Sequence, residues 1–302
     1  MNEKKAYLET ELEHWNDLTQ LNHGFTSKFV YRGQGDSKWR LSSSLERLMD
    51  LYHPFPPSGY FQMLDYYAKN IIKDFKWKFP IYAKGPIPSD DDTLEWCSIL
   101  QHYGAPTRMV DFTYSPYIAL YMAIESSKAR YCSIWCLNKH VYNSPIIEEF
   151  SKKTGECFTS PFELEKYMHE QVNLRLKGGK QKDDKPGIFL VRPDRTNERI
   201  CRQQGLFAIP SDMSLSFEDN VFSVITNKNA VKIPFGDVIG YSNSDNGTYK
   251  QTDIALIKIN ISTKLRLELM NYLNQVNINA ESMYPGLEGL AKSMSFPRTK
   301  TG

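Results

Sequence analysis

The sequence contains no long apolar segment and no apolar stretch near its start. No hydrophobic run approaches the roughly 18 residues that are needed to cross a bilayer. The opening residues, MNEKKAYLETELEHW, include lysines but lack the apolar core of a secretory signal. We therefore expect a cytoplasmic protein without a membrane segment.

The sequence also has few cysteines and a small net charge. The 302 residues include five cysteines, which lack the spacing of a zinc finger or a disulfide framework. The 37 basic and 35 acidic residues give a net charge of only +2, which excludes a histone-like binder that relies on bulk charge. With 41% hydrophobic residues, the chain can form the core of a soluble enzyme in a reducing compartment.

The common catalytic motifs are absent as well. There is no P-loop, no GxSxG nucleophile elbow, no HExxH zinc helix and no GxGxxG dinucleotide loop. Cys132 and Cys136 share one face of an expected strand, but only His140 lies at a ligand-like spacing from them. We interpret the two cysteines as core residues and expect no metal.

Helical signals dominate the first half of the chain. Apolar residues recur at helical spacing near the N-terminus, which predicts a helical extension over residues 1–24, and again over 58–79. A helix is expected from about Thr93 to a glycine cap at Gly104. The pairs Ser115-Pro116 and Ser160-Pro161 each place Ser before Pro as the start of a helix.

Strand signals follow a short first run at Phe29–Tyr31 and are concentrated beyond residue 130. The later candidates are 133–137, 188–192, 206–209, 221–225, 231–234 and 254–261, and a last helix is expected over 264–274. Helices first and strands later, without βαβ alternation, predict a single α+β domain. Its mainly helical N-terminal part would pack on a mixed or antiparallel sheet.

The first polar cluster is Tyr31-Arg32-Gly33-Gln34, at the end of the first β-prone run. An arginine beside glycine can present several planar donors where the backbone approaches closely, which suits a phosphate or pyrophosphate. The same arginine could instead hold a carboxylate within the protein, and chemistry alone does not separate the two interpretations.

A second cluster, residues 100–121, is dense in ionisable and aromatic groups at a loop that leads into a helix. The free N–H groups of a helix N-terminus attract anions. Alternatively, Arg108 and Asp111 pair with each other and the tyrosines are core residues, which we favour for the tyrosines. The candidate site residues here are His102, Tyr103, Arg108, Asp111, Thr113, Tyr117 and Tyr121.

Two further segments carry candidate binding residues. Gln203 and Gln204 precede a strand and could recognise a ribose or a base edge, or they could form a solvated loop end. Residues 175–185 hold five basic and two acidic side chains. Contacts to nucleic-acid phosphates would suit such a loop. The candidates there are Arg175, Lys177, Lys180 and Lys182.

Taken in order, these segments resemble the FRG family, which is named for a Phe-Arg-Gly motif. The matching patterns are YRGQ, QHYGxPTRxxDxTxxPxxALYxA, RIxxQQGxF and the closing segment Glu281–Ala291. The resemblance spans residues 25–292 as one domain, followed by a tail over 293–302. Tyr31 replaces the family Phe, Phe112 stands where Trp is usual, and Gly286 and Glu288 stand where two aspartates are usual.

The motif order is also similar to that of the ADP-ribosyltransferase superfamily, which places Arg on a first core strand, a hydroxyl segment in the middle and a carboxylate late. This resemblance implies NAD as co-substrate and Arg32 as the pyrophosphate clamp. The implied catalytic residues are Arg32, Asp111, Thr113 and Glu288. The implied cofactor-binding residues are Tyr31, Arg32, Gly33, Gln34, His102, Tyr103, Arg108, Tyr117, Tyr121, Gln203 and Gln204.

Within that scheme a tyrosine would stack on a ring of NAD. Asp111 or Glu288 would stabilise the oxocarbenium-like cation or deprotonate the acceptor. The implied function is that of a toxin or defence effector that modifies RNA or DNA, slightly favoured over protein, under the control of an antitoxin or chaperone. A non-catalytic nucleotide or nucleic-acid sensor, and an interaction scaffold, are the alternatives.

Overall fold

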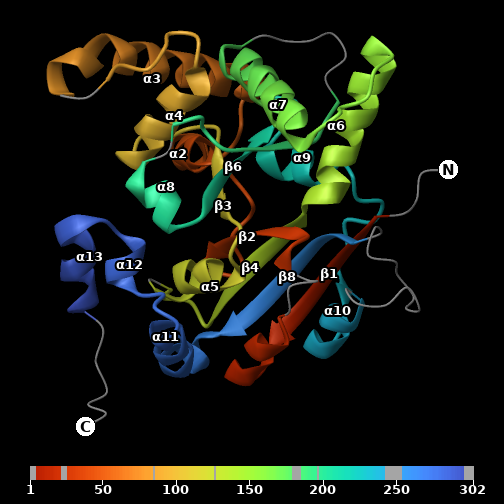
Figure 1. Ribbon diagram of the computed structural model, residues 1–302, viewed down its shortest axis with the longest axis vertical. Coiled ribbons are helices and arrows are strands. Elements are labelled where there is room, and N and C mark those ends of the chain that lie inside the picture. Colours follow the sequence, from red (N-terminus) through yellow and green to blue (C-terminus); the bar gives the residue numbers. More distant parts are fainter. Residues whose placement is uncertain are drawn as a thin grey trace.

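One mixed sheet runs through the middle of the protein (Figure 1). The computed structural model describes residues 5–21, 26–83, 86–125, 127–178, 185–195, 197–241 and 254–295. The strands are β1 (Ala6–Leu12), β2 (Phe29–Gln34), β3 (Val110–Thr113), β4 (Tyr131–Asn138), β5 (Ile188–Val191), β6 (Gly205–Pro210), β7 (Val231–Lys232) and β8 (Ile254–Ser262). Their order is β5-β6-β3-β2-β4-β8-β1-β7. β1 pairs in parallel with β7 and β8, and the other pairs are antiparallel.

The helices begin where the sequence provides caps. Ser43, Asp92 and Ser160 each accept a hydrogen bond from a backbone N–H in the first turn of the helix that follows, which satisfies a donor that has no partner within the helix. The helices are α2 (Ser44–Tyr52), α3 (Tyr60–Tyr82), α4 (Thr93–His102), α5 (Pro116–Glu125), α6 (Lys139–Thr154), α7 (Pro161–Leu176), α8 (Glu198–Arg202), α9 (Phe217–Phe222), α10 (Phe235–Tyr241), α11 (Arg266–Gln275), α12 (Ala280–Met283) and α13 (Gly286–Ser293), with 3₁₀ turns η1 (Trp15–Gln20) and η3 (Thr263–Leu265).

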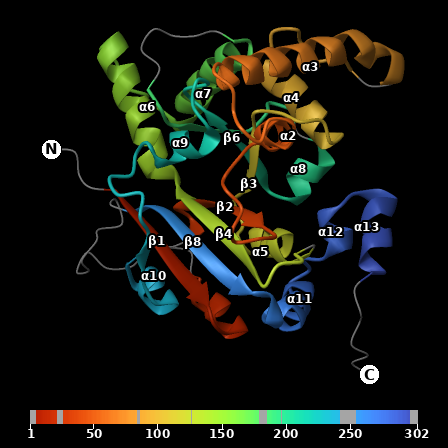
Figure 2. The same ribbon diagram turned by 180° about the vertical axis from the view of Figure 1, so that it is seen from behind.

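Helices cover both faces of the sheet (Figures 1 and 2). Because side chains alternate along a strand, Tyr7 and Leu8 of β1 face opposite sides. Leu8 joins the core formed with α5, α10 and α11, whereas Tyr7 joins the core formed with α6 and α9. A third cluster packs α4 and α7 against β5 and β6, and α3 packs against α2 and α4. The result is the α+β domain with a mixed sheet that the order of elements predicts.

The prediction of a helical extension over residues 1–24 is wrong. Residues 6–12 form β1, which pairs along its length with β8, and within the described part of the predicted extension, residues 5–21, only the short turn η1 follows it. Leu8 and Leu12 are buried, so this segment is an integral strand and not an appendage. The strand expected at 221–225 is also wrong, because Ser216 caps α9 and Val221 lies inside that helix.

Among the described residues, no helix combines the length and the apolar character of a bilayer span.

Candidate functional site

Strands β2 and β3 pair at one position and then separate. The pair is Tyr31 with Thr113, beyond which β2 follows β4 and β3 follows β6. Arg32 reaches into the gap, and its Nη1 donates a hydrogen bond to the backbone carbonyl of Asp111 at 2.9 Å. A cavity of about 40 Å³ lies here, and we call it the Arg32 notch. It is lined by Tyr31, Arg32, Gly33, Asp111, Phe112, Thr113, Met122, Ile200, Gln203, Gly205, Leu206 and Phe207.

The guanidinium of Arg32 is only partly satisfied. Its Nε is buried and has no hydrogen-bond partner. Within the described ranges, no carboxylate lies within ion-pair distance of it. Burial lowers the pKa of Arg32 to about 10, an effect that Asp111 opposes and Arg47 reinforces. Arg32 therefore stays charged at neutral pH, and an anion in the notch would gain charge-assisted hydrogen bonds.

Two side chains beside the notch were not singled out by the sequence analysis. Arg47 of α2 is exposed, and its charge contributes to the lowered pKa of Arg32. Partial burial lowers the pKa of Arg47 itself, and the carboxylate of Asp111 opposes that effect. Gln101 of α4 donates to the carboxylate of Asp111 at 2.6 Å and accepts the hydroxyl of Thr107. Gln101 therefore orients Asp111, and Arg47 adds positive charge.

Thr113 is used to hold the turn that precedes β6. Its hydroxyl donates to the carbonyl of Gln203 at 2.7 Å and accepts the N–H of Ser115 at 3.1 Å. The side chain of Gln203 donates in turn to the carbonyl of Met283 at 3.2 Å. Thr113 thus positions one wall of the notch rather than presenting a free hydroxyl.

Of the Tyr-Arg-Gly-Gln motif, only the arginine presents its side chain to the notch. Tyr31 is fully buried in the opposite core. Gly33 lies under α5, where a Cβ would overlap the carbonyl oxygen of Ala119, so this glycine allows helix packing rather than phosphate approach. Gln34 is buried and links Trp135 to the carbonyl of Arg40.

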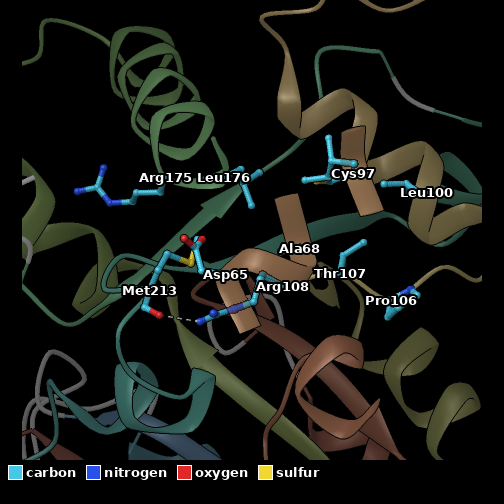
Figure 3. Close-up of a pocket in the computed structure, with 11 residues that line it drawn as sticks. Asp65, Ala68, Cys97, Leu100, Pro106, Thr107, Arg108, Arg175, Leu176 and Met213 are labelled. Atoms are coloured by element: carbon cyan, nitrogen blue, oxygen red, sulfur yellow. Dashed lines mark hydrogen bonds between the residues drawn. The ribbon is translucent and has the colours of Figure 1, made fainter. Parts of the chain in front are cut away.

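Arg108 lies in a different pocket, between α3, α4 and α7 (Figure 3). It is 4% exposed, and its Nη2 donates to the carbonyls of Met213 and Leu215 at 3.3 Å. Its Nε and Nη1 are buried without partners, and burial lowers its pKa. Arg108 does not pair with Asp111, whose carboxylate accepts Gln101, so the expected internal ion pair between them is not formed. Arg108 stabilises the 213–215 turn from beneath α3.

Glu288 stands outside the notch. It lies on α13 and pairs with Lys292 at 3.0 Å, and its other charged neighbours are Arg199 and His102. Burial lowers the pKa of His102, with Arg199 adding to the effect and Glu288 opposing it. The structure therefore separates the two carboxylates proposed from sequence, and Asp111 is the one beside Arg32.

Tyr103, Tyr117 and Tyr121 are not among the residues that line the notch. Tyr121 is buried and donates to Glu125 at 3.2 Å, which confirms its interpretation as a core residue. Tyr103 is 75% exposed and contacts His102. Tyr117 and Gln204 line a second cavity of about 470 Å³ together with Arg202, on the other side of the Gln203-Gln204 turn.

Two of the basic residues expected to contact nucleic acid, Arg175 and Lys177, are engaged within the protein. Arg175 is buried, donates to the carbonyl of Ser211 at 2.8 Å and lies over the ring of Phe189. Lys177 pairs with Asp91 at 2.7 Å. Lys180 and Lys182 lie outside the described residues. Arg175 is therefore a structural residue that cannot contact a nucleic-acid phosphate.

Most of the residues that line the notch lie in a segment that matches a known protein family. Residues 27–132 match the family model of the FRG domain. Over this segment the chain is similar to the FRG domain. The matched segment includes Arg32, Arg47, Gln101 and Asp111. Its strands β2 and β3 pair with β4 and β6, so the sheet that carries Arg32 extends beyond the matched residues. No curated protein and no solved structure matches the chain.

Proposed function

We propose that the FRG domain binds a phosphorylated nucleotide at Arg32, and that this nucleotide is NAD, whose ADP-ribose is transferred to a macromolecule. The observation that carries the proposal is a charged arginine in a cavity between two strands, with a buried Nε that lacks a partner. Such a group is costly to leave unsatisfied, and a pyrophosphate oxygen would satisfy it.

The volumes of the two cavities suit a ligand whose phosphate and nucleoside parts bind in separate cavities. The notch, at about 40 Å³, has room for a small group such as a phosphate. The cavity across the Gln203-Gln204 turn, at about 470 Å³, falls in the roughly 300–1,000 Å³ range of ligand pockets. We propose that the notch takes a phosphate and that the larger cavity takes the nucleoside part.

Asp111 is the proposed catalytic carboxylate. In the transfer, the bond between the nicotinamide nitrogen and the ribose C1′ breaks, and its electron pair leaves with nicotinamide. An acceptor oxygen or nitrogen then bonds to C1′ and loses its proton. A carboxylate held by Gln101 beside the notch can stabilise the positive charge on the ribose and take that proton.

Binding without turnover is the second candidate, and one observation favours it. The carboxylate of Asp111 accepts Gln101, the hydroxyl of Thr113 donates to Gln203, and Glu288 pairs with Lys292. Each of these three side chains is thus engaged in a contact within the protein, which is the arrangement expected of a sensor.

One assay separates the two candidates. Purified protein is incubated with NAD that is labelled in the adenylate phosphate, with and without cell extract. Label in macromolecules and release of nicotinamide, both lost in Asp111→Asn and Arg32→Lys, support the transferase. Saturable binding of NAD without turnover supports the sensor, and absence of both rejects the proposal. Arg40→Lys, an exposed arginine paired with Glu218, is the matched control.

The proposed transferase activity leads to two further proposals, on the acceptor and on the biological role. We propose RNA or DNA as the acceptor, and nuclease or protease digestion of the labelled product identifies it. We also propose a toxin or defence role under an antitoxin or chaperone. Expression of the wild-type chain should then slow bacterial growth, and Arg32→Lys should not. Equal growth inhibition by both proteins would separate toxicity from the notch.

A further inference from the structure

Ligand-type side chains from three elements meet away from the notch. Asp92 precedes α4, His169 lies on α7 and Asp194 follows β5. Among the described residues, one ligand atom from each of these three side chains lies within 4.8 Å of the other two. His169 Nε2 is 3.6 Å from Asp92 Oδ1 and 3.9 Å from Asp194 Oδ2.

These separations are too long for hydrogen bonds and close to those of ligands that share an ion. Two atoms that each lie about 2.1 Å from a tetrahedral ion are about 3.4 Å apart. The Nε2 of His169 is buried and has no hydrogen-bond partner. The imidazole thus presents a buried nitrogen between two carboxylates without bonding to either.

A buried carboxylate beside the cluster adds an independent observation. Glu95 is 8% exposed, and its ion pair with Arg195 is long, at 3.9 Å. Three carboxylates in a partly buried site with one distant arginine lack positive charge, which a cation would supply.

Asn173 holds two of the ligands in place. Its Oδ1 accepts the N–H of Leu94 at 2.8 Å, which fixes the orientation of the amide. Its Nδ2 then lies 3.4 Å from Asp92 Oδ1 and 3.5 Å from His169 Nδ1. Asp92 Oδ1 also accepts the N–H of Glu95 at 3.1 Å. Metal sites commonly have such a supporting layer of polar groups around the ligands.

We propose that Asp92, His169 and Asp194 form a binding site for a divalent transition metal ion, Zn²⁺ or Mn²⁺, with Glu95 adding negative charge beside it. One imidazole with carboxylates favours these ions over Ca²⁺ and Mg²⁺, which prefer all-oxygen ligand sets. The ion links α4 and α7 to the segment that leads into α8 and Gln203. This inference does not depend on the function proposed above.

The test uses the full chain after treatment with a chelator. ZnCl2, MnCl2, MgCl2 and CaCl2 are titrated separately by calorimetry, and Tm is measured with each ion. We expect one Zn²⁺ or Mn²⁺ per chain. At a free ion concentration about a hundred times Kd, linkage should raise Tm by about 5 °C. Equal, weak binding of all four ions would indicate an unspecific acidic surface and would overturn the proposal.

Two variants remove ligands with little risk to the fold. The side chain of Asp194 is 75% exposed, so Asp194→Asn should fold and should bind at least about tenfold more weakly. His169→Gln should abolish the shift in Tm. Asp90→Asn, a 95% exposed acid near the same helix, and His140→Gln are the matched controls, and should bind as the wild type does. Unchanged binding in Asp194→Asn and His169→Gln, or no shift of Tm with any ion, overturns the site.

Discussion

At Arg32, a single hydrogen bond fixes the position of a guanidinium that otherwise faces a cavity. The bond to the carbonyl of Asp111 joins β2 to β3 where the strands have already separated. The side chain therefore serves the sheet and remains available to a ligand. Neither role alone explains both its position and its unpartnered Nε.

Replacement of Arg32 by Lys distinguishes these roles. Lysine keeps the charge but loses the planar pair of donors, so we expect NAD affinity to fall roughly ten- to a hundredfold, equivalent to about 1.5–3 kcal/mol. Calorimetric titration and Tm are measured on the same preparation. A purely structural arginine would lower Tm and affinity together, and a stable variant with full affinity would remove Arg32 from the site.

His102 should make the protein sensitive to mild acid. Its pKa is lowered from 6.5, mainly by burial, and its Nδ1 has no hydrogen-bond partner. As the pH falls below 6.5, the unfolded chain takes up a proton more readily than the folded chain, so stability is lost as the pH falls through the lowered pKa. Tm measured between pH 5 and 8 should fall less steeply in acid for His102→Gln than for the wild type. Parallel curves would contradict the assignment.

At the scale of elements, the sequence predicts most of the strands and those helices that begin at a clear local signal, whereas helices such as α2 and α6 are missed. Asp92, Ser115 and Ser160 are cap residues whose effect is confined to one turn, so α4, α5 and α7 begin where expected. The sequence predicts a helix in place of β1 because Tyr7, Leu8 and Leu12 also fit helical spacing. The strand is specified by β8, about 250 residues away, and no local pattern contains that information.

The candidate site shows the same limit. Arg32 was found because an arginine beside glycine is a local pattern, yet the glycine proved to serve α5 instead. Arg47 and Gln101 carry no such pattern, and they meet Asp111 only through tertiary packing. The proposed ligands Asp92, His169 and Asp194 are likewise dispersed over about a hundred residues. They have no spacing motif, which is why the sequence predicts no metal.

The crossing of α5 over β2 depends on Gly33. In Gly33→Ala the new methyl would overlap Ala119 and come within 2.7 Å of the amide nitrogen of Ala123, and both contacts are backbone atoms that cannot rotate away. We expect a loss of about 1–3 kcal/mol or more in the free energy of unfolding by urea. Gly35→Ala meets its nearest atom at 3.5 Å and should change stability by less than about 0.5 kcal/mol. Equal stability of the two variants would show that α5 is not held at this glycine.

At the scale of the whole molecule, the sheet pairs a strand from early in the sequence, β1, with one from late in the sequence, β8. β8 lies between β4 and β1, and its residues pack into both main cores. The first strand therefore stabilises the same sheet that carries Arg32, although it lies before the segment that matches the FRG family.

Leu8→Ala measures this contribution. Leu8 is fully buried, so its truncation should cost about 2–5 kcal/mol in the free energy of unfolding. Leu287→Ala, at an 81% exposed leucine, should cost less than about 0.5 kcal/mol. Chemical denaturation of both variants checks this, and a small effect at Leu8 would show that β1 contributes little to the stability of the sheet.

The place of β1 beside β8 also constrains how the protein is made on the ribosome. β1 ends at Leu12 and its partner ends at Ser262, so 250 residues must be synthesised before the pairing can form. At about 5–20 residues per second, the nascent chain carries β1 without its long partner β8 for roughly 12–50 s. During that interval the strand is open to a holding chaperone, or to pairing with the nascent strand of a neighbouring ribosome on the same messenger.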